Sequence, residues 1–416
     1  MLDITQLNRS LSLEATAPIV NLVVPFTRIA SDDSAPCSSA LPKPAVTWQV
    51  TRSNHLNSTA SICGFRHDDQ PELTTAEGKA LIDDLAAYGV TRLRLAGGEP
   101  LLRADLPELI AYASERGMQT ELHTYGRLLT RELAAELKRR GLFSVKILQK
   151  SGGAAERQRG TQQAFSTALE AYANCEHACL EAAMEIPLDH ATVAELPAIL
   201  NLIERQPIRS VVFAHVVHQY NGRNPHDDLT HFETRRALDQ ILERAEDVAG
   251  RGVAINLATD QNHTDGIYFY LRLARRNPRR AAVAFRLLSK SSACVQGAGV
   301  GVAGIDFTGN VFPDSHWPNH ILGNVRETSF SEIWKNSSDP LLLGLRDRLP
   351  LLKGRCGSCR WKQACGGNVR ARAEQSSGNP WMSDPACYLS NSEIGKELTE
   401  QVEAMEDDVL LLKQAA

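Results

Sequence analysis

Long hydrophobic runs and an excess of one charge are both missing from this 416-residue sequence. No stretch approaches the roughly 18 consecutive apolar residues of a membrane-spanning helix. The first residues also lack the basic segment and apolar run of a secretory signal, so we expect a cytoplasmic protein. The 45 Lys and Arg residues nearly balance the 49 Asp and Glu residues. This balance gives no bulk electrostatic case for a nucleic acid or an anionic membrane as partner.

Cysteine, in contrast, is present at nine positions, and four of the nine crowd into the last quarter of the chain. Thiols stay reduced in the cytoplasm, where clustered cysteines bind metal more often than they form disulfides. The four are Cys356, Cys359, Cys365 and Cys387. Four thiolates satisfy either a tetrahedral zinc ion or a cubane iron–sulfur cluster, and their spacing leaves both open.

Strand-like and helix-like segments alternate from residue 45 to about residue 216. Strands that are each followed by a helix pair in parallel through right-handed crossovers. Six such units are fewer than the eight of a closed barrel. We therefore predict an α/β fold, a partial six-unit parallel β/α barrel with a small cysteine-rich C-terminal domain. The expected strands are Val46–Thr51, Arg92–Ala96, Thr120–Thr124, Val145–Leu148, Leu180–Ile186 and Val211–Val216.

Several helix starts can be read from capping residues. Thr74–Glu77 and Thr192–Glu195 have the spacing of capping boxes, and Asp105 and Thr130 precede two further helices. A further strand and helix are expected within residues 252–275, followed by a glycine-rich hairpin after Lys290. Four segments are predicted: an irregular lead-in at 1–44, the barrel at 45–284, the cysteine-rich domain at 285–392 and a C-terminal helix at 393–416.

The segment LRLAGGEPLL, residues 93–102, ends a predicted strand and enters a loop at the C-terminal edge of the barrel. Catalytic groups gather at this edge in such barrels. Gly97 and Gly98 allow a close backbone approach to a ligand, and Glu99 can accept hydrogen bonds from an ammonium group. A simple turn is the alternative for Gly97–Pro100.

With this motif the sequence resembles the radical S-adenosylmethionine (SAM) family. WQVTR (48–52) is similar to its first barrel strand, HTYG (123–126) to its third-strand signature, and Arg159-Gly160 to a usual pair after the fourth strand. The resemblance implies that Gly97, Gly98, Glu99 and Pro100 bind S-adenosylmethionine, with Glu99 and its neighbours holding the methionyl amino group.

The C-terminal part resembles the members of this family that act in heme d1 biosynthesis and hence in denitrification. The resembling segments are GVGVAGIDFTGNVFPDSHW, ILGNVRETSFSEIW and the cysteine-rich run from residue 355 to 389. The resemblance implies an auxiliary 4Fe-4S cluster on the four C-terminal cysteines, a tetrapyrrole substrate and an external electron donor. It also implies removal of two propionate side chains from a didecarboxylated siroheme, leaving oxo groups.

The sequence departs from the family at the three-cysteine loop that follows the first strand. Alignment on WQVTR places the three positions at Asn54, Ser58 and Ser61, which supply no thiolate. Cys63 is one thiol where three are needed. A cubane cluster needs soft thiolate ligands, so an N-terminal cluster is in doubt. A second departure is Lys150, which stands where the family often has an acid.

Three interpretations remain open. In the first, the chain is an inactive relative that acts as a tetrapyrrole-binding or assembly partner in the same pathway. In the second, the sequence carries a short frame slip over residues 53–66, and the protein is a radical SAM oxidoreductase. In the third, the four thiolates bind zinc in a binding module without a redox role. The sequence favours the first two over the third and leans towards an enzyme. It does not specify the oligomeric state.

Other candidate residues have simpler explanations. Cys175 and Cys179 lie four apart on a predicted helix and are expected to pack there, and Cys294 is a stray thiol or a reserve ligand. His215 is expected to be a buried, hydrogen-bonded histidine. The Trp-Pro between His316 and His320 argues against a helical metal pair. Arg370 and Arg372 either meet tetrapyrrole carboxylates or form a solvated basic face.

Overall fold

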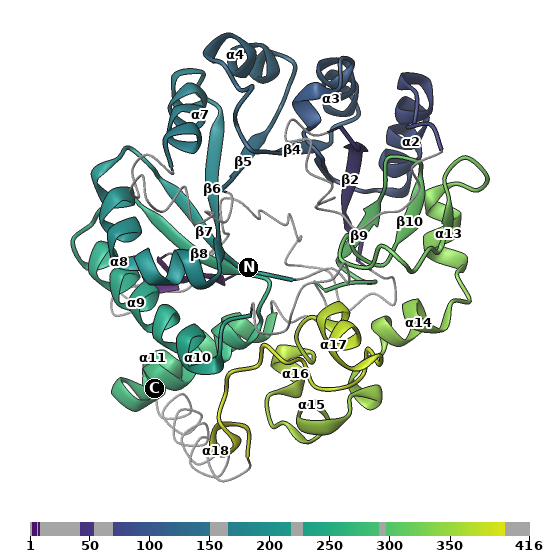
Figure 1. The fold of residues 1–416 in the computed structure, drawn as a ribbon. Helices are drawn as coiled ribbons and strands as arrows, with labels where there is room; N and C mark the ends of the chain where they lie inside the picture. The colour runs from purple at the N-terminus through teal and green to yellow at the C-terminus, as the bar shows by residue number, and fades with distance from the viewer. Residues whose placement is uncertain are drawn as a thin grey trace, which may run out of the picture.

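An open sheet of eleven strands organises the chain (Figure 1). The computed structural model describes residues 2–5, 7–8, 42–53, 70–149, 165–217, 228–290 and 297–395. Neighbouring strands follow the order β1-β8-β7-β6-β5-β4-β3-β2-β9-β10-β11. The strands are β1 Leu2–Asp3, β2 Ala45–Thr51, β3 Arg92–Gly97, β4 Gln119–Thr124, β5 Ser144–Leu148, β6 Glu181–Leu188, β7 Ser210–His215, β8 Asn256–Asp260, β9 Val302–Ile305, β10 Asn310–Phe312 and β11 Gly323–Asn324.

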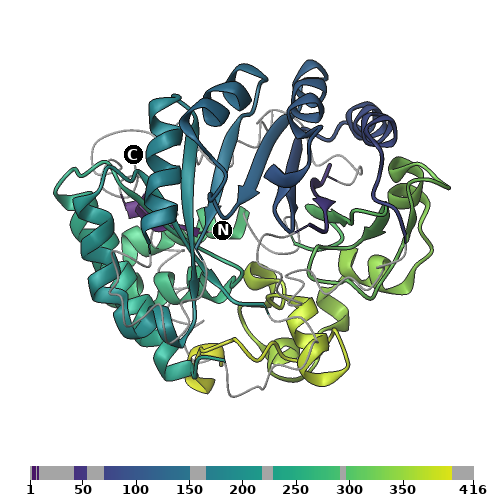
Figure 2. The same cartoon turned by 45° about the horizontal axis from the view of Figure 1, so that its top comes forward.

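All six predicted strands are present, and β8 adds a seventh parallel strand to them. The barrel stays open because β2 pairs with β9, and β8 pairs with β1, so the two ends of the parallel series never meet. In Figures 1 and 2 the sheet curves like a horseshoe, and α15–α17 lie across its opening. The predicted α/β fold with a partial barrel is thereby confirmed.

Helices cover the outer face of the sheet and the open side. Those that follow barrel strands are α2 Thr75–Tyr88, α3 Leu106–Glu115, α4 Arg131–Arg139, α7 Ser166–His177, α8 His190–Arg205, α9 His231–Gly250, α10 Thr264–Arg276 and α11 Pro278–Lys290. The C-terminal helices are α13 Phe330–Asn336, α14 Pro340–Arg346, α15 Gly354–Ser358, α16 Lys362–Cys365, α17 Arg370–Ser377 and α18 Asn391–Ile394. Short 3₁₀ turns are η2 Pro100–Leu102 and η4 Leu349–Leu351.

The hydrophobic core lies between the sheet and its outer helices. The fully buried Trp48 of β2 contacts Gly78 of α2 so closely that a Cβ there would lie 2.8 Å from the indole. Alternate residues of the strands face the other way, into the lumen. The core therefore fixes which side chains the barrel presents to a ligand.

Three of the four predicted helix starts are confirmed, and one is wrong. Thr74 forms its capping box with Glu77, and Thr130 caps α4. Asp105 directly precedes α3, as predicted. It makes no capping hydrogen bond, because its carboxylate binds Arg103 and Thr75 instead. Helix α8 begins at His190 with Asp189 as its cap, so Thr192 occupies the third helical position rather than the cap.

The ends of the predicted segments also differ. Within the 1–44 lead-in, β1 pairs antiparallel with β8 and Ile4 is fully buried, so that part is not irregular. The expected boundary at 284/285 falls inside α11, and β9 continues the barrel sheet. Residues 396–416, most of the expected C-terminal helix, lie outside the described residues.

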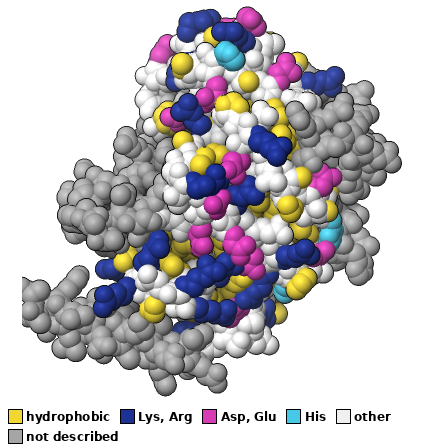
Figure 3. All heavy atoms as spheres, turned by 90° about the vertical axis from the view of Figure 1, so that its left-hand side faces the viewer, with side chains coloured by type: hydrophobic (Ala, Val, Ile, Leu, Met, Phe, Trp, Pro, Cys, Tyr) yellow, Lys and Arg dark blue, Asp and Glu magenta, His cyan; other side chains and the backbone are white. Residues whose placement is uncertain are grey.

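The outward faces of α8, α9 and α10 carry mixed charge. Figure 3 shows acidic and basic side chains lying next to one another on this side of the molecule. Arg244 pairs with Glu204 at 2.8 Å, and Arg272 pairs with Asp239. Among the helices that the structure describes, none has the length and apolar character to cross a bilayer.

Candidate functional site

The loop after β3 places a buried carboxylate at the C-terminal edge of the barrel. Glu99 has no exposed surface, and its oxygens accept hydrogen bonds from the Thr124 hydroxyl at 2.7 and 2.9 Å. The backbone N–H groups of Tyr125 and Leu101 donate to it at 3.1 and 3.2 Å. The two sequence motifs, GGEP and HTYG, therefore meet. In the described ranges Glu99 forms no ion pair with Lys, Arg or His, so its charge is available to a cationic ligand group.

Close contact with the end of β2 explains the two glycines before Glu99. Gly97 has a φ of +136°, and a Cβ there would overlap the Thr51 carbonyl oxygen. A Cβ on Gly98 would overlap the Ser53 carbonyl and lie 2.7 Å from that of Arg52. The N–H of Glu99 donates to Ser53 at 2.7 Å. The glycines thus let the GGEP loop lie directly against the chain that leads to residue 54.

We expect Gly98→Ala to lower the free energy of unfolding by about 1–3 kcal/mol, because a backbone pair must move apart. Chemical denaturation measures this change. Gly250→Ala is the matched control, since a Cβ there meets open space. Equal stability of the two variants would contradict the assigned contact.

Charged side chains from separate strands face the barrel lumen. Arg94, Glu121, Lys146 and Asp260 come from β3, β4, β5 and β8 and line one cavity. Burial opposes ionisation here, but Glu185 and Glu121 together raise the pKa of Lys146 above its ordinary value. The Lys146 ammonium lies 3.1 Å from the Glu185 carboxylate. The lumen is therefore a polar, ionised chamber rather than an apolar core.

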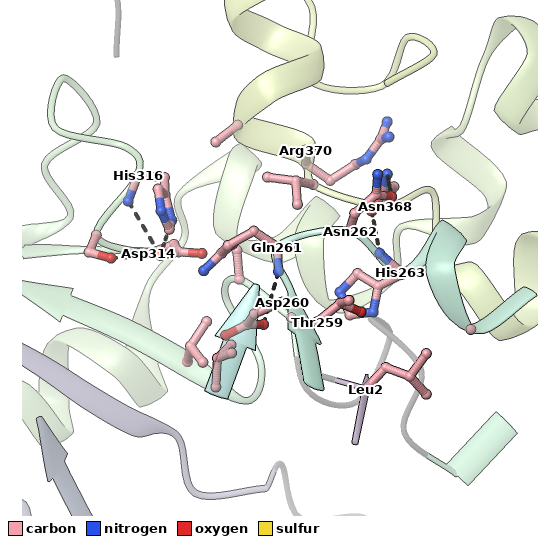
Figure 4. Close-up of a pocket in the computed structure, with 18 of the residues that line it drawn as sticks. Leu2, Thr259, Asp260, Gln261, Asn262, His263, Asp314, His316, Asn368 and Arg370 are labelled. Atoms are coloured by element: carbon pink, nitrogen blue, oxygen red, sulfur yellow. Dashed lines mark hydrogen bonds and ion pairs between the residues drawn. The ribbon is translucent and has the colours of Figure 1, made fainter. Parts of the chain in front are cut away.

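The same cavity reaches the C-terminal segments, as Figure 4 shows. Asp314 and His316, which follow β10, lie on one side, and His263, which precedes α10, lies on the other. His316 Nδ1 is 3.0 Å from Asp314 Oδ1. This pair was not predicted from the sequence. The signal that could have found it is an acid two residues before a histidine in the turn after a strand.

The four C-terminal cysteines line a second cavity, together with Thr264 and Ile267 of α10. Cys356 lies in α15, and Cys359 directly follows that helix. Cys365 is the last residue of α16, and Cys387 follows α17. No three His, Cys, Asp or Glu side chains of the described chain are gathered around a single metal position. What the structure shows of the four thiols is that they line one cavity.

The surroundings of these thiols affect their ionisation. Burial, with the proximity of the other thiols, raises the pKa of Cys365 well above its ordinary value, and burial also raises the pKa of Cys359 and Cys387. Thiolates at these positions would form only if a metal bound and displaced the protons. The Cys359 sulfur accepts from Trp361 N–H at 3.4 Å, and the Arg370 guanidinium lies 3.9 Å from the Cys356 sulfur.

The interpretation of Arg370 and Arg372 as a solvated basic face is wrong, because both side chains are buried. Their contact with tetrapyrrole carboxylates stays a prediction, and Arg370 lines the lumen cavity. Arg370 donates to the carbonyls of Pro380 and Met382 at 3.0 and 2.7 Å. Arg372 binds both carboxylate oxygens of Asp384, at 2.8 and 3.0 Å. Although burial opposes it, the Arg372 charge lowers the pKa of Asp384 below its ordinary value. Both arginines hold the cysteine-rich segment together.

The lumen cavity and the cysteine cavity adjoin each other. Ile267 and Asn368 line both. The Asn368 amide donates to Asn262 at 2.7 Å, and its oxygen accepts from the His263 N–H at 2.8 Å. These bonds join α10 to the segment between α16 and α17. A ligand in the lumen would therefore lie next to whatever the four thiols hold.

Several predicted positions lie outside the described residues: Asn54, Ser58, Ser61, Cys63, Lys150, Arg159, Gly160 and Cys294. By composition, Asn54, Ser58 and Ser61 offer an amide and two hydroxyls, which are poor ligands for iron–sulfur chemistry. The residues at these positions do not fit a cubane cluster.

Most of the remaining candidates follow the simpler expectations. Cys175 is fully buried in α7, as expected, and burial raises its pKa to about 12. The expectation for Cys179 is wrong, because α7 ends at His177 and Cys179 is exposed. His215 is buried, with Nε2 2.9 Å from Asp265. His320 is 3.0 Å from Asp339 and forms no helical pair with His316.

Known proteins share this architecture. The Radical SAM superfamily matches residues 59–203, and SPASM, an iron–sulfur cluster-binding domain, matches residues 294–376. The solved structure of anSMEcpe with bound AdoMet superposes with a TM-score of 0.62 at 13% identity, covering 88% of this chain and 99% of that one.

Two relatives are similar over most of their length. An Fe-coproporphyrin III synthase from Methanosarcina barkeri is 40% identical, over 85% of this chain and 90% of its own. A pre-heme d1 synthase from Dinoroseobacter shibae is 35% identical, over 85% of this chain and 88% of its own. The polar barrel, the buried Glu99 loop and the cysteine-lined cavity thus agree with the sequence matches, and this chain belongs to the radical SAM superfamily with a C-terminal SPASM domain.

Proposed function

We propose that this chain acts in a heme pathway by binding an iron-bearing tetrapyrrole in its barrel lumen, beside an iron–sulfur cluster held by Cys356, Cys359, Cys365 and Cys387. The single observation that carries the proposal is the shared wall of the two cavities, formed by Ile267 and Asn368. The names of the two relatives, an Fe-coproporphyrin III synthase and a pre-heme d1 synthase, support the substrate class.

Four thiolates satisfy either zinc or a cubane cluster, and the match of residues 294–376 to an iron–sulfur cluster-binding domain favours the cubane. Such a cluster supplies one-electron transfer when bound. The Arg370 guanidinium lies beside the Cys356 sulfur, and the Trp361 N–H donates to the Cys359 sulfur, so both would tune a bound cluster. An external electron donor is part of the proposal.

Glu99 and its glycines fit the methionyl ammonium of S-adenosylmethionine. Its carboxylate is held by neutral donors only, among the contacts of the described residues, so an ammonium group would give it an opposite charge. We place the cofactor's amino group there, with Gly97, Gly98 and Pro100 forming the loop around it.

The substrate transformation admits two candidates. One is the conversion of propionate side chains of a didecarboxylated siroheme to oxo groups, as in heme d1 biosynthesis. The other is tetrapyrrole binding or assembly by a catalytically inactive relative. Asn54, Ser58 and Ser61 favour the second, because they do not fit the cluster that would start radical chemistry. We therefore assign no radical step to this chain.

Iron and labile sulfide counts after anaerobic reconstitution, with a 5′-deoxyadenosine assay under dithionite, distinguish the candidates. We expect about four irons per chain, one cubane, and no 5′-deoxyadenosine. About eight irons with 5′-deoxyadenosine formation would support the propionate-converting enzyme, and mass spectrometry of the tetrapyrrole would then identify its product. Bound zinc without sulfide would contradict both candidates.

A further inference from the structure

We propose that His316 is an axial ligand of the substrate's iron, with Asp314 as the residue that orients it. This inference rests on the proposed function, because it assumes that an iron-bearing tetrapyrrole enters the lumen. It concerns a side chain that neither the GGEP loop nor the cysteine cavity uses.

The hydrogen bond between His316 and Asp314 sets which ring nitrogen is available. With Nδ1 3.0 Å from Asp314 Oδ1, the Nδ1 proton is donated to the carboxylate, and the lone pair is left on Nε2. Within the described ranges, Nε2 has no hydrogen-bond or ion-pair partner. Metal-binding histidines commonly donate their second N–H to a carboxylate, which fixes the ring and raises its basicity. This pair therefore has the form of a ligand and its orienting group.

The turn that carries the pair is itself well held. The Asp314 carboxylate also accepts from the Ser315 hydroxyl at 3.1 Å and from the His316 N–H at 3.3 Å. Together with the Nδ1 contact, these hydrogen bonds keep the imidazole in one orientation, as a preorganised site requires.

The position of His316 agrees with the role. It lines the same cavity as the charged lumen residues of β3, β4, β5 and β8, and that cavity adjoins the four thiols. An iron bound to His316 would hold the tetrapyrrole between the barrel strands and the cysteine-rich segment. His263, on the other side of the cavity in Figure 4, has no carboxylate holding its ring in the described structure and is the competing candidate.

Visible absorption and resonance Raman spectra of the protein with ferric and ferrous iron–coproporphyrin test the assignment. We expect the wild-type protein to show an axial-histidine spectrum with an iron–histidine stretching band. His316→Ala should lose that band, and added imidazole should restore it. Asp314→Asn should keep histidine ligation but lower the stretching frequency, because an amide is a weaker acceptor than a carboxylate.

His320→Ala is the matched control, since His320 is also paired with a carboxylate but is not among the residues of the cavity. A wild-type spectrum in His316→Ala, or loss of the band in His263→Ala instead, would overturn the assignment. Binding of metal-free coproporphyrin tests the proposed substrate class independently of the His316 assignment. It should bind the wild-type protein and His316→Ala equally by fluorescence quenching, whereas no binding of either porphyrin to the wild-type protein would refute the proposed substrate class.

Discussion

Cys365→Ser is expected to abolish the C-terminal iron–sulfur cluster: the reconstituted variant should lose the visible absorption and most of the about four irons per chain. A serine hydroxyl is a harder and much less acidic ligand than a thiol, so it replaces a cluster thiolate poorly. Cys365 lines the cavity that Cys356, Cys359 and Cys387 also line, and its thiol is the one whose pKa is raised well above the ordinary value. Iron and sulfide analysis with absorption spectroscopy measures the change.

Cys179→Ser is the control for the cysteine variant. Cys179 is exposed at the end of α7 and is not among the residues of the cysteine cavity. The Cys179→Ser variant should retain the wild-type iron and sulfide content. Equal iron in both variants would show that the cluster does not depend on Cys365.

Glu99→Gln is expected to weaken S-adenosylmethionine binding by about 10–100-fold. A hydrogen bond to a charged group contributes roughly 1.5–3 kcal/mol, and 1.4 kcal/mol corresponds to a tenfold change in affinity. The variant removes the negative charge from a site that offers the ligand's ammonium no other anion in the described loop. Equilibrium dialysis with labelled S-adenosylmethionine measures the dissociation constant.

The amide could also disturb the loop itself, because its NH₂ group would face the N–H of Tyr125 or Leu101. 5′-Methylthioadenosine separates the two effects, since it keeps the nucleoside but lacks the methionyl ammonium. It should bind the wild-type protein and Glu99→Gln with the same affinity. An equal loss for both ligands would mean that the loop had collapsed, and an unchanged affinity for S-adenosylmethionine would remove Glu99 from the site.

Local sequence patterns predicted the barrel because each unit is a local structure. A strand, a capped helix and a glycine stop follow one another within about 30 residues, as in β4, α4 and Gly141. The meeting of Glu99 with Thr124 follows from the same regularity, because adjacent parallel strands end at one edge.

Pairings between distant residues were not predictable in this way. Leu2 pairs with Thr259, more than 250 residues away, and nothing near either residue indicates the other. Asp105 has the position of a helix cap, but its carboxylate binds the Arg103 side chain and makes no capping hydrogen bond to the helix backbone. A charged residue takes the strongest partner that the tertiary fold supplies.

The candidate site shows the same division. Cysteine spacing predicted that four thiols gather, since two of them share a tight turn and the others follow within 32 residues. Burial of Arg370 and Arg372 was missed, because their partners Pro380, Met382 and Asp384 are recognisable only once the chain after α17 folds back. The Asp314–His316 pair lies close in sequence, but only the folded cavity indicates what it faces.

The central claim is that a tetrapyrrole and a reduced iron–sulfur cluster lie side by side in one chain. Electron paramagnetic resonance of the reconstituted, reduced protein with bound copper–coproporphyrin measures their proximity, because two neighbouring electron spins couple. The account predicts that the copper signal is broadened and relaxes faster, and that Cys365→Ser abolishes both effects. A copper signal that is the same in the wild-type protein and in Cys365→Ser, with the porphyrin bound and the wild-type cluster reduced, would contradict it.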